Sequence, residues 1–207
     1  DMIASAETGS GKTGAYLLPV LNRLLQRPGP AANMTTRLTT VLVLAPTREL
    51  VVQIEDDLQG FIYHTALTSA EVFGGTPIGP QTQALGAGVD VVVATPGRLL
   101  DHLRGGIPAF AGVDTLILDE ADRMLDMGFW PDVRRIVAAL PGSRKEDRRQ
   151  TLLLSATIPD WVLTPLKELS HDAAYVQIGQ RGAPADGISH AVERMPASRK
   201  TAWLTSF

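Results

Sequence analysis

The chain contains no cysteine, which excludes disulfides and thiolate metal sites, and its four histidines are too scattered along the sequence to form a metal site. No apolar run approaches the ~20 residues that span a bilayer. The first residues lack the basic segment and the cleavage pattern of a signal peptide. These absences favour neither export nor a membrane partner, and they predict a cytoplasmic protein.

An excess of positive charge is also missing. The chain has 19 lysines and arginines against 22 acidic residues, which gives a formal net charge of -3. This excludes a general basic field, so any contact with nucleic acid has to be a local patch. What the chain does have is 44% hydrophobic residues in a length of 207, enough to bury one core of ordinary domain size.

The most informative segment is residues 6–13, Ala-Glu-Thr-Gly-Ser-Gly-Lys-Thr, which follows a short apolar stretch and precedes a leucine-rich helical pattern. Gly9 and Gly11 allow successive backbone N–H groups to turn inward and form an anion nest. Lys12 can then reach the β- and γ-phosphates, and Thr13 can place a hydroxyl on Mg²⁺. The segment therefore predicts a nucleoside triphosphate site. Its expected binding residues are Ala6, Thr8, Gly9, Ser10, Gly11, Lys12 and Thr13.

Two observations leave the nature of this site open at this point. The general P-loop pattern begins with glycine, whereas this chain has Ala6. Taken singly, glycines mark turns, and a lysine at a helix start is commonly a solvated surface charge. The joint spacing favours the phosphate site, but it does not say which reaction the triphosphate drives.

A second segment supplies the carboxylates that such a site needs. Residues 115–118, Thr-Leu-Ile-Leu, have the composition of a buried parallel strand and are followed by Asp-Glu-Ala-Asp. Carboxylates at the carboxyl end of a central strand face the nucleotide crevice. We expect Asp119 to hold Mg²⁺ together with Thr13, and Glu120 to orient or deprotonate the attacking water. The alternative is a helix start that carries acidic residues to suit its dipole.

With these segments in view, the chain resembles the DEAD-box RNA helicases. Further segments occur in the order of that family, and they are Pro46-Thr47-Arg48-Glu49-Leu50, Gly74-Gly75, Thr95-Pro96-Gly97-Arg98 and Ser155-Ala156-Thr157. The resemblance extends from residue 1 to about residue 178. It also accounts for Ala6, because the loop of that family is similar to A-x-T-G-x-G-K-T. The stretch 125–129, Leu-Asp-Met-Gly-Phe, is most similar to bacterial members.

The resemblance implies a RecA-like P-loop NTPase domain that uses ATP and Mg²⁺, with Lys12, Asp119 and Glu120 as catalytic residues. It implies the ATP-binding half of an ATP-dependent RNA helicase, which couples ATP binding and hydrolysis to local unwinding of RNA duplexes or remodelling of RNA–protein complexes. The expected division is a helicase domain in 1–178, a linker in 179–187, and the first strand and helix start of a second RecA-like domain in 188–207. An upstream segment that recognises adenine, and arginines of the second domain, are expected outside this sequence, so these 207 residues alone should be near inactive.

Short β-rich runs alternate with helical patterns, which predicts an α/β fold with a mostly parallel sheet and helices on both faces. The expected strands are 40–44, 89–95, 115–119, 151–155 and 174–178. The first helix is expected from Lys12 to about Gln26, with its buried side formed by Leu17, Leu21, Leu24 and Leu25. Residues 27–38 and the charge run 144–149 are expected to be surface loops, although the charge run could also touch RNA.

The starts of two predicted helices indicate where RNA would bind. Pro46-Thr47 and Pro96 stand at helix starts, so two sets of orphan N–H groups should lie at one edge of the sheet. Arg48 and Arg98, each one turn inside, would add forked donors for phosphate, and Gly75 would allow a close backbone approach. Such contacts would hold single-stranded or short duplex RNA without reading its bases, although either proline–threonine pair alone could be a simple cap. The expected RNA contacts are Pro46, Thr47, Arg48, Gly74, Gly75, Thr95, Pro96, Gly97 and Arg98.

Ser155 and Thr157 follow a strand expected beside the acidic one, so their hydroxyls could bond Asp119 or Asp122 and sense the nucleotide. The resemblance implies that Asp122, Ser155 and Thr157 couple hydrolysis to RNA release. A Ser/Thr turn that caps the helix at Asp160 is a simpler interpretation and is compatible with the coupling role.

Three functions fit parts of this sequence. The first is the ATP-binding half of an RNA helicase. The second is a DNA helicase or translocase with a related P-loop, which the joint occurrence of Asp-Glu-Ala-Asp and Ser-Ala-Thr disfavours. The third is an RNA-binding half-domain that never hydrolyses ATP, and for 207 residues alone it stays open. ATPase assays with RNA and with DNA would separate the three.

Overall fold

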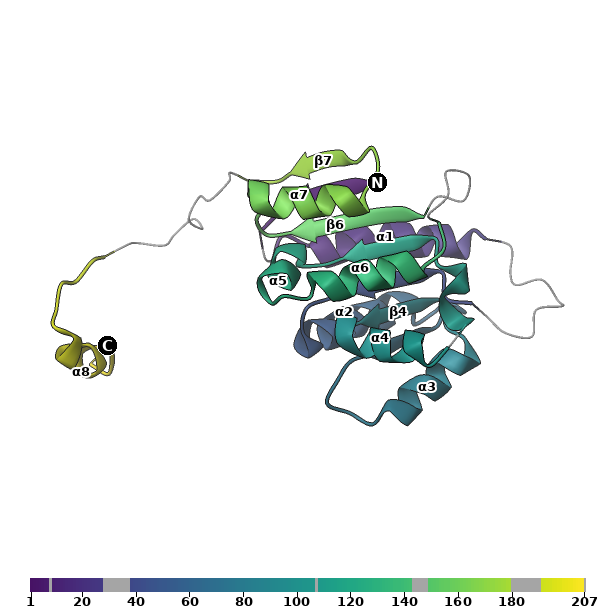
Figure 1. The fold of residues 1–207 in the computed structure, drawn as a ribbon, viewed down its shortest axis with the longest axis horizontal. Coiled ribbons are helices and arrows are strands. Elements are labelled where there is room, and N and C mark those ends of the chain that lie inside the picture. Colours follow the sequence, from purple (N-terminus) through teal and green to yellow (C-terminus); the bar gives the residue numbers. More distant parts are fainter. Residues whose placement is uncertain (8, 28–37, 107, 143–148, 180–190, 207) are drawn as a thin grey trace.

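A seven-stranded sheet forms the centre of the protein, as seen in a computed structural model that describes residues 1–7, 9–27, 38–106, 108–142, 149–179 and 191–206. The strand order is β3-β4-β2-β5-β6-β1-β7, and each pairing is parallel (Figure 1). The strands are β1 (Met2–Ser5), β2 (Val41–Leu44), β3 (Ser69–Val72), β4 (Val91–Ala94), β5 (Thr115–Leu118), β6 (Gln150–Ser155) and β7 (Ala174–Gln177). The helices are α1 (Lys12–Leu25), α2 (Arg48–Ile62), α3 (Ile78–Ala87), α4 (Pro96–Arg104), α5 (Ala121–Asp126), α6 (Trp130–Ala139), α7 (Asp160–Leu169) and α8 (Lys200–Leu204), with short 3-10 helices η1 (Pro108–Gly112) and η2 (Ala197–Arg199).

Helices cover both faces of the sheet, which confirms the predicted α/β fold class. Leu42 and Leu44 of β2 belong to a core that is shared with α4, α5, α6 and α7. Val41 and Val43 of the same strand belong to a second core, which is shared with α1 and α2. Figure 1 shows α4, α6 and α7 together on one side of the sheet. Because successive side chains of a strand point to opposite faces, one short apolar strand contributes to both cores.

Helix α1 has the expected start and the expected apolar stripe. Its buried residues are Tyr16, Leu17, Val20, Leu21 and Leu24. The prediction that Leu25 is buried was wrong, since 53% of its surface is exposed. Leu25 is the last residue of the helix, so it lacks the shielding that a following helical turn gives.

The predicted strands are all present, with ends within two residues of the expected positions. The expected strands do not include β1 or the edge strand β3. Strand β3 reads Ser-Ala-Glu-Val, and only its second and fourth residues are buried. An edge strand that buries one face needs no continuous apolar run, so its sequence gives a weak signal.

Some predictions fall outside the described residues: they concern Thr8, residues 28–37, the charge run 144–148 and linker residues 180–187. Residues 191–206 contain η2 and α8 but no strand, so the strand expected for a second domain does not form in this described stretch. The division into domain, linker and second domain stays a prediction. Among the helices that the structure describes, none is long and apolar enough to cross a bilayer. The cytoplasmic location also stays a prediction.

Candidate nucleotide site and RNA surface

The predicted site segments follow the carboxyl ends of two groups of neighbouring strands. Strands β1, β6 and β5 lie side by side and lead to segments 6–13, 155–157 and 119–122. Strands β3, β4 and β2 also lie side by side, and they lead to segments 74–75, 95–98 and 46–48. Since carboxyl ends of parallel strands meet at one edge of a sheet, the structure brings both sets of predicted residues to the same edge, in adjacent halves.

Two glycines of the loop between β1 and α1 have a left-handed backbone conformation, which anion nests use. Gly9 and Gly11 have φ values of 82° and 84°, in the left-handed region that favours glycine. A Cβ added to either glycine would meet nothing within 4 Å, so the glycine requirement comes from the backbone conformation and not from crowding. The Ala6 amide donates to the Ser155 carbonyl at 3.2 Å, which extends the β1–β6 pairing into the loop.

The Lys12 side chain folds back over this loop. Its Nζ donates to the carbonyl oxygens of Ala6 and Glu7, the second at 2.8 Å. The ammonium group therefore lies within the turn whose amides form the predicted nest. The role of Lys12 as a phosphate ligand stays a prediction.

Asp119, at the end of β5, is almost fully enclosed, with 3% of its surface exposed. Its carboxylate accepts hydrogen bonds from the Tyr16 hydroxyl at 3.0 Å and from the Glu120 amide at 2.9 Å. Burial raises the pKa of the Asp119 carboxyl above its ordinary value, while the two hydrogen bonds and the charge of Lys12 lower it. Both hydrogen-bond donors are neutral, so a bound cation would strongly stabilise the charged form of this buried carboxylate. This fits the predicted role of Asp119 as a Mg²⁺ ligand.

Tyr16 is a site residue that the sequence analysis does not identify. Burial, followed by the charge of Asp119, raises the pKa of the Tyr16 hydroxyl, and a hydrogen bond with Thr13 lowers it. The hydroxyl therefore stays protonated and joins the start of α1 to the end of β5, which brings Thr13 and Asp119 together. The signal was its spacing: Tyr16 lies four residues after Lys12, hence on the same face of the helix.

Glu120 has an unusual backbone for a residue with a side chain. Its φ of 51° and ψ of 50° place it in the left-handed region, directly before α5. The Glu120 carboxylate accepts from Arg123 at 3.1 Å, within the same short helix segment. Backbone strain of this kind persists where the surrounding structure imposes it, and it occurs often at functional sites.

The predicted link between the acidic segment and the segment after β6 is present for one of its two hydroxyl residues. The Thr157 amide and hydroxyl both donate to Asp122 Oδ2 at 3.0 Å. The expectation that the Ser155 hydroxyl bonds Asp119 or Asp122 was wrong, because it donates to the Thr157 carbonyl. Ser155 is fully buried, and its hydroxyl satisfies a backbone group of its own turn.

On the other half of the edge, the start of α2 meets the turn after β3. Thr47 caps α2, and its Oγ1 accepts from the Leu50 amide at 3.3 Å. The helix begins at Arg48, so the expectation that Arg48 stands one turn inside was wrong. The Arg48 guanidinium lies over the Phe73 ring, 4.8 Å from its centroid, and 3.8 Å from the position that a Cβ on Gly75 would take. Gly75 itself has a φ of 84°.

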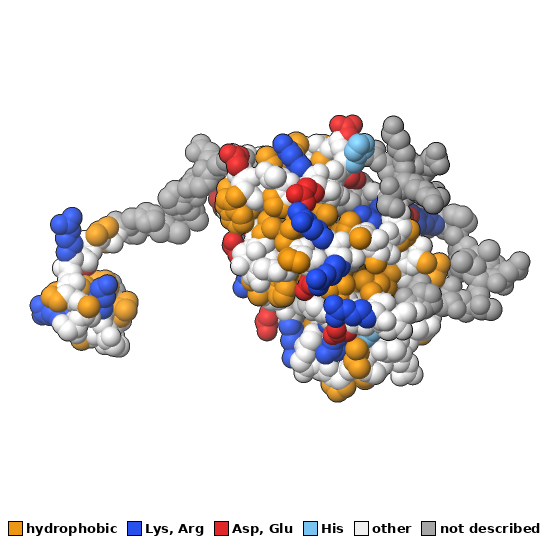
Figure 2. Space-filling model, in the orientation of Figure 1, with side chains coloured by type: hydrophobic (Ala, Val, Ile, Leu, Met, Phe, Trp, Pro, Cys, Tyr) orange, Lys and Arg blue, Asp and Glu red, His pale blue; other side chains and the backbone are white. Residues whose placement is uncertain are grey.

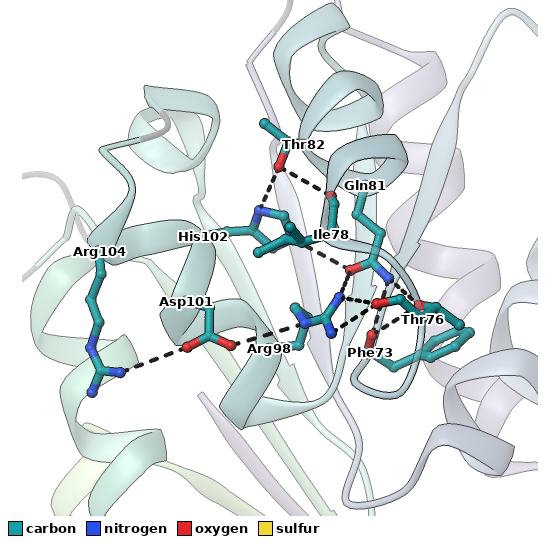
Figure 3. A network of polar contacts seen from close by, with 9 residues as sticks. All are labelled: Phe73, Thr76, Ile78, Gln81, Thr82, Arg98, Asp101, His102 and Arg104. Carbon is teal, nitrogen blue, oxygen red and sulfur yellow. Dashed lines mark hydrogen bonds and ion pairs between the residues drawn. The ribbon is translucent and has the colours of Figure 1, made fainter.

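Helix α4 starts as predicted, with Thr95 as its cap and Pro96 at its first position. Arg98 is the third residue of this helix, and its side chain is only 13% exposed. Both of its terminal nitrogens donate to the Thr76 carbonyl at 3.0 Å (Figure 3). In this arrangement Arg98 holds the turn after β3, and its predicted contact with phosphate stays a prediction.

Basic side chains elsewhere on the molecule are interleaved with acidic ones. Figure 2 shows a row of lysine and arginine side chains across the face of the sheet that carries α4, α6 and α7, with acidic side chains beside them. Ion pairs join Arg104 to Asp101 and Arg135 to Asp132 within this face. Such pairing leaves little net positive charge, in agreement with the expected absence of a general basic field.

Comparison with known proteins identifies the family to which the chain belongs. A family model described as DEAD/DEAH box helicase matches residues 1–164. A solved structure described as a hypothetical ATP-dependent RNA helicase from Sulfolobus tokodaii is similar with 33% identity and a TM-score of 0.71, and the match covers 86% of this chain and 48% of that one. A DEAD box protein from the hyperthermophile Methanococcus jannaschii is similar with 36% identity and a TM-score of 0.72, and the match covers 86% of this chain and 45% of that one.

The chain belongs to the DEAD/DEAH box helicase family, and its fold is the RecA-like domain of DEAD-box proteins. It spans about half the length of the two solved structures that it resembles. The resemblance that the sequence motifs indicate is thereby confirmed.

Proposed function

We propose that this chain is the ATP-binding half of an ATP-dependent RNA helicase. The observation that carries the proposal is the hydrogen bond from Tyr16 to Asp119 at the end of β5, with Lys12 folded over the loop after β1 and its charge acting on Asp119. Family membership supports the same assignment. In the complete protein, binding and hydrolysis of ATP would be coupled to local unwinding of RNA or remodelling of RNA–protein complexes.

The P-loop residues would hold the triphosphate. The amides around Gly9 and Gly11, with the dipole of α1, would bind phosphate oxygens, and Lys12 would exchange its loop carbonyls for the β- and γ-phosphates. Thr13 and Asp119 would hold Mg²⁺, with Tyr16 keeping the Asp119 carboxylate in place. When bound, Mg²⁺ would neutralise charge on the phosphates.

Hydrolysis requires a positioned water molecule and stabilisation of the charge that develops. Glu120 would orient that water or accept its proton, because its carboxylate lies directly after the Asp119 ligand. Arginines from a second RecA-like domain would stabilise the transition state, and such groups contribute ~10³ to 10⁵ in rate. The 207 residues alone should therefore turn over ATP near the background rate.

RNA would cross the other half of the same edge. The amides at the starts of α2 and α4 and the turn at Gly74-Gly75 would contact the sugar–phosphate backbone, and Arg48 would add a charged donor. Contacts of this kind position a strand without reading its bases, so the RNA would be bound independently of sequence. The hydrogen bonds from Thr157 to Asp122 would link nucleotide state to this surface.

Hydrolysis assays test this assignment. ATP turnover is measured with RNA and with DNA, on this chain and on a protein that also carries the second helicase domain. We expect near-background rates for this chain, RNA-stimulated turnover for the two-domain protein, and loss of turnover with retained nucleotide binding in Glu120→Gln. Stimulation by DNA equal to that by RNA would favour a DNA translocase. Strong RNA-stimulated turnover by residues 1–207 would show that the catalytic unit is assigned incorrectly.

A further inference from the structure

Gln81 lies on α3, outside the segments proposed to bind nucleotide or RNA. Its amide nitrogen donates to the Phe73 carbonyl at 3.0 Å and to the Thr76 hydroxyl at 2.8 Å. Its amide oxygen accepts from Arg98 Nη1 at 3.4 Å and lies 3.4 Å from His102 Nε2. One side chain on α3 thus contacts the end of β3, the turn after it, and α4 (Figure 3).

Chemistry fixes the orientation of this amide. The Phe73 carbonyl can only accept, so the group that faces it has to be the amide NH₂. The Arg98 guanidinium can only donate, so the group that faces it has to be the amide oxygen. His102 Nε2 therefore also faces an acceptor and carries its proton there. Gln81 has no alternative flip that satisfies these neighbours.

The segment that Gln81 braces is the turn that carries Gly74 and Gly75. Gln81 binds it from the α3 side through Phe73 and Thr76, while Arg98 binds the Thr76 carbonyl from the α4 side. The two braces are themselves connected, since Gln81 contacts Arg98. The position of this turn relative to the start of α4 is consequently set by two connected side chains, Gln81 and Arg98.

We propose that Gln81 is a positioning residue for the RNA surface: it holds the Gly74-Gly75 turn and the Arg98 guanidinium in the mutual arrangement that receives the sugar–phosphate backbone. The inference rests on the proposed function, because it assumes that RNA crosses this edge. Gln81 acts through Thr76 and Arg98, and its own amide is occupied by protein groups. Loss of the amide would leave the Phe73 carbonyl without this donor and would release one restraint on Arg98, so the RNA contacts would have to be ordered during binding.

The test compares Gln81→Leu with Gln83→Leu, a matched control because Gln83 lies on the same helix with an exposed side chain. The readouts are anisotropy of a fluorescein-labelled ten-nucleotide oligouridylate at low salt, calorimetric titration with Mg²⁺-ATP, and thermal unfolding. We expect Gln81→Leu to weaken RNA binding by about two- to tenfold, the range for lost hydrogen bonds of ordinary strength. Mg²⁺-ATP affinity should stay within twofold, and Gln83→Leu should match the wild type in every readout.

A second variant keeps the shape of the side chain. Gln81→Glu retains an acceptor for Arg98 but removes the donors to Phe73 and Thr76, so it should also weaken RNA binding, even if Gln81→Leu fails to fold. Wild-type RNA affinity in both variants would overturn the inference, and so would an equal loss of RNA and Mg²⁺-ATP affinity, which indicates general destabilisation. Absence of RNA binding by the wild type would instead contradict the proposed function.

Discussion

At the scale of single residues, the proposed nucleotide site depends on a carboxylate that burial makes hard to ionise. The hydrogen bonds to Asp119 favour its ionised form against this burial, and the one from Tyr16 comes from a different element. The sequence predicts Asp119 from its place after an apolar run, but Tyr16 falls within a helical stripe that also predicts a core residue. Only the contact between α1 and the end of β5 in the structure distinguishes a site residue from an ordinary core residue at this position.

The raised pKa of Asp119 predicts a pH-dependent stability. An acid whose pKa is higher in the folded than in the unfolded protein binds more protons when folded, so unfolding free energy falls as pH rises from the ordinary carboxyl pKa through the raised one. Asp119→Asn lacks this titration. Its unfolding free energy relative to the wild type should therefore increase with pH across that window and become constant above it, as measured by calorimetry between acid and neutral pH. A difference that does not change with pH would contradict the burial of an ionised Asp119.

Tyr16→Phe is the companion variant, because it removes one donor to the same carboxylate. At neutral pH it should lower the free energy of unfolding by about 1.5 to 3 kcal/mol, the range for a hydrogen bond to a charged group. Chemical denaturation monitored by circular dichroism measures this value. Unchanged stability would show that the hydroxyl does not support Asp119.

The left-handed backbone of Glu120 predicts an order of stability between two variants. Glu120→Ala and Glu120→Gly both lose the ion pair with Arg123, but only glycine adopts a φ of 51° without strain. The glycine variant should therefore be more stable than the alanine variant by about 1 kcal/mol. Thermal unfolding of the two proteins side by side provides the measurement. An alanine variant of equal or higher stability would show that residue 120 is not left-handed in solution.

At the scale of elements, the sequence predicts the strands that feed the site well, because β2, β4 and β5 are buried on both faces and read as continuous apolar runs. The expected strands do not include β1 or β3, and in β3 Ser69 and Glu71 interrupt the apolar pattern. The missing strand β3 also affects the prediction of the turn that follows it. Without β3, the Gly74-Gly75 turn has no fixed position, and its contacts with Gln81 and Arg98 cannot be predicted.

The link between α5 and the segment after β6 predicts a coupling defect. Thr157→Val keeps the hydrogen bond from the backbone amide to Asp122 and removes the one from the hydroxyl, whereas Thr157→Ser keeps both hydrogen bonds. In a protein with both helicase domains, we expect Thr157→Val to reduce RNA stimulation of ATP turnover severalfold while Mg²⁺-ATP binding stays within twofold. Steady-state kinetics with and without RNA measure this, and Thr157→Ser should restore the stimulation. Full stimulation in Thr157→Val would show that the hydroxyl does not contribute to coupling.

At the scale of the whole molecule, charge limits how RNA can be held. The net charge is -3, and the basic side chains on the face that carries α4 and α6 are paired with acidic ones. Two or three neutralised phosphates on single-stranded RNA imply a slope of about -1.4 to -2.1 in a plot of log affinity against log salt concentration. Fluorescence titrations at several salt concentrations give this slope. A much steeper slope, abolished by neutralising the arginines and lysine of segment 144–149, would place the RNA on that segment instead.

Strands β5, β6 and β1 carry the proposed nucleotide site, and strands β3, β4 and β2 carry the proposed RNA surface. Calorimetric titration of Mg²⁺-ATP into the wild type, Lys12→Ala and Arg48→Ala tests this division most directly. Lys12→Ala should weaken nucleotide binding at least tenfold, because a charge-assisted hydrogen bond contributes about 1.5 to 3 kcal/mol, while Arg48→Ala should bind like the wild type. Equal nucleotide affinity of the wild type and Lys12→Ala, or an equal loss in both variants, would contradict the division of the sheet into these two halves.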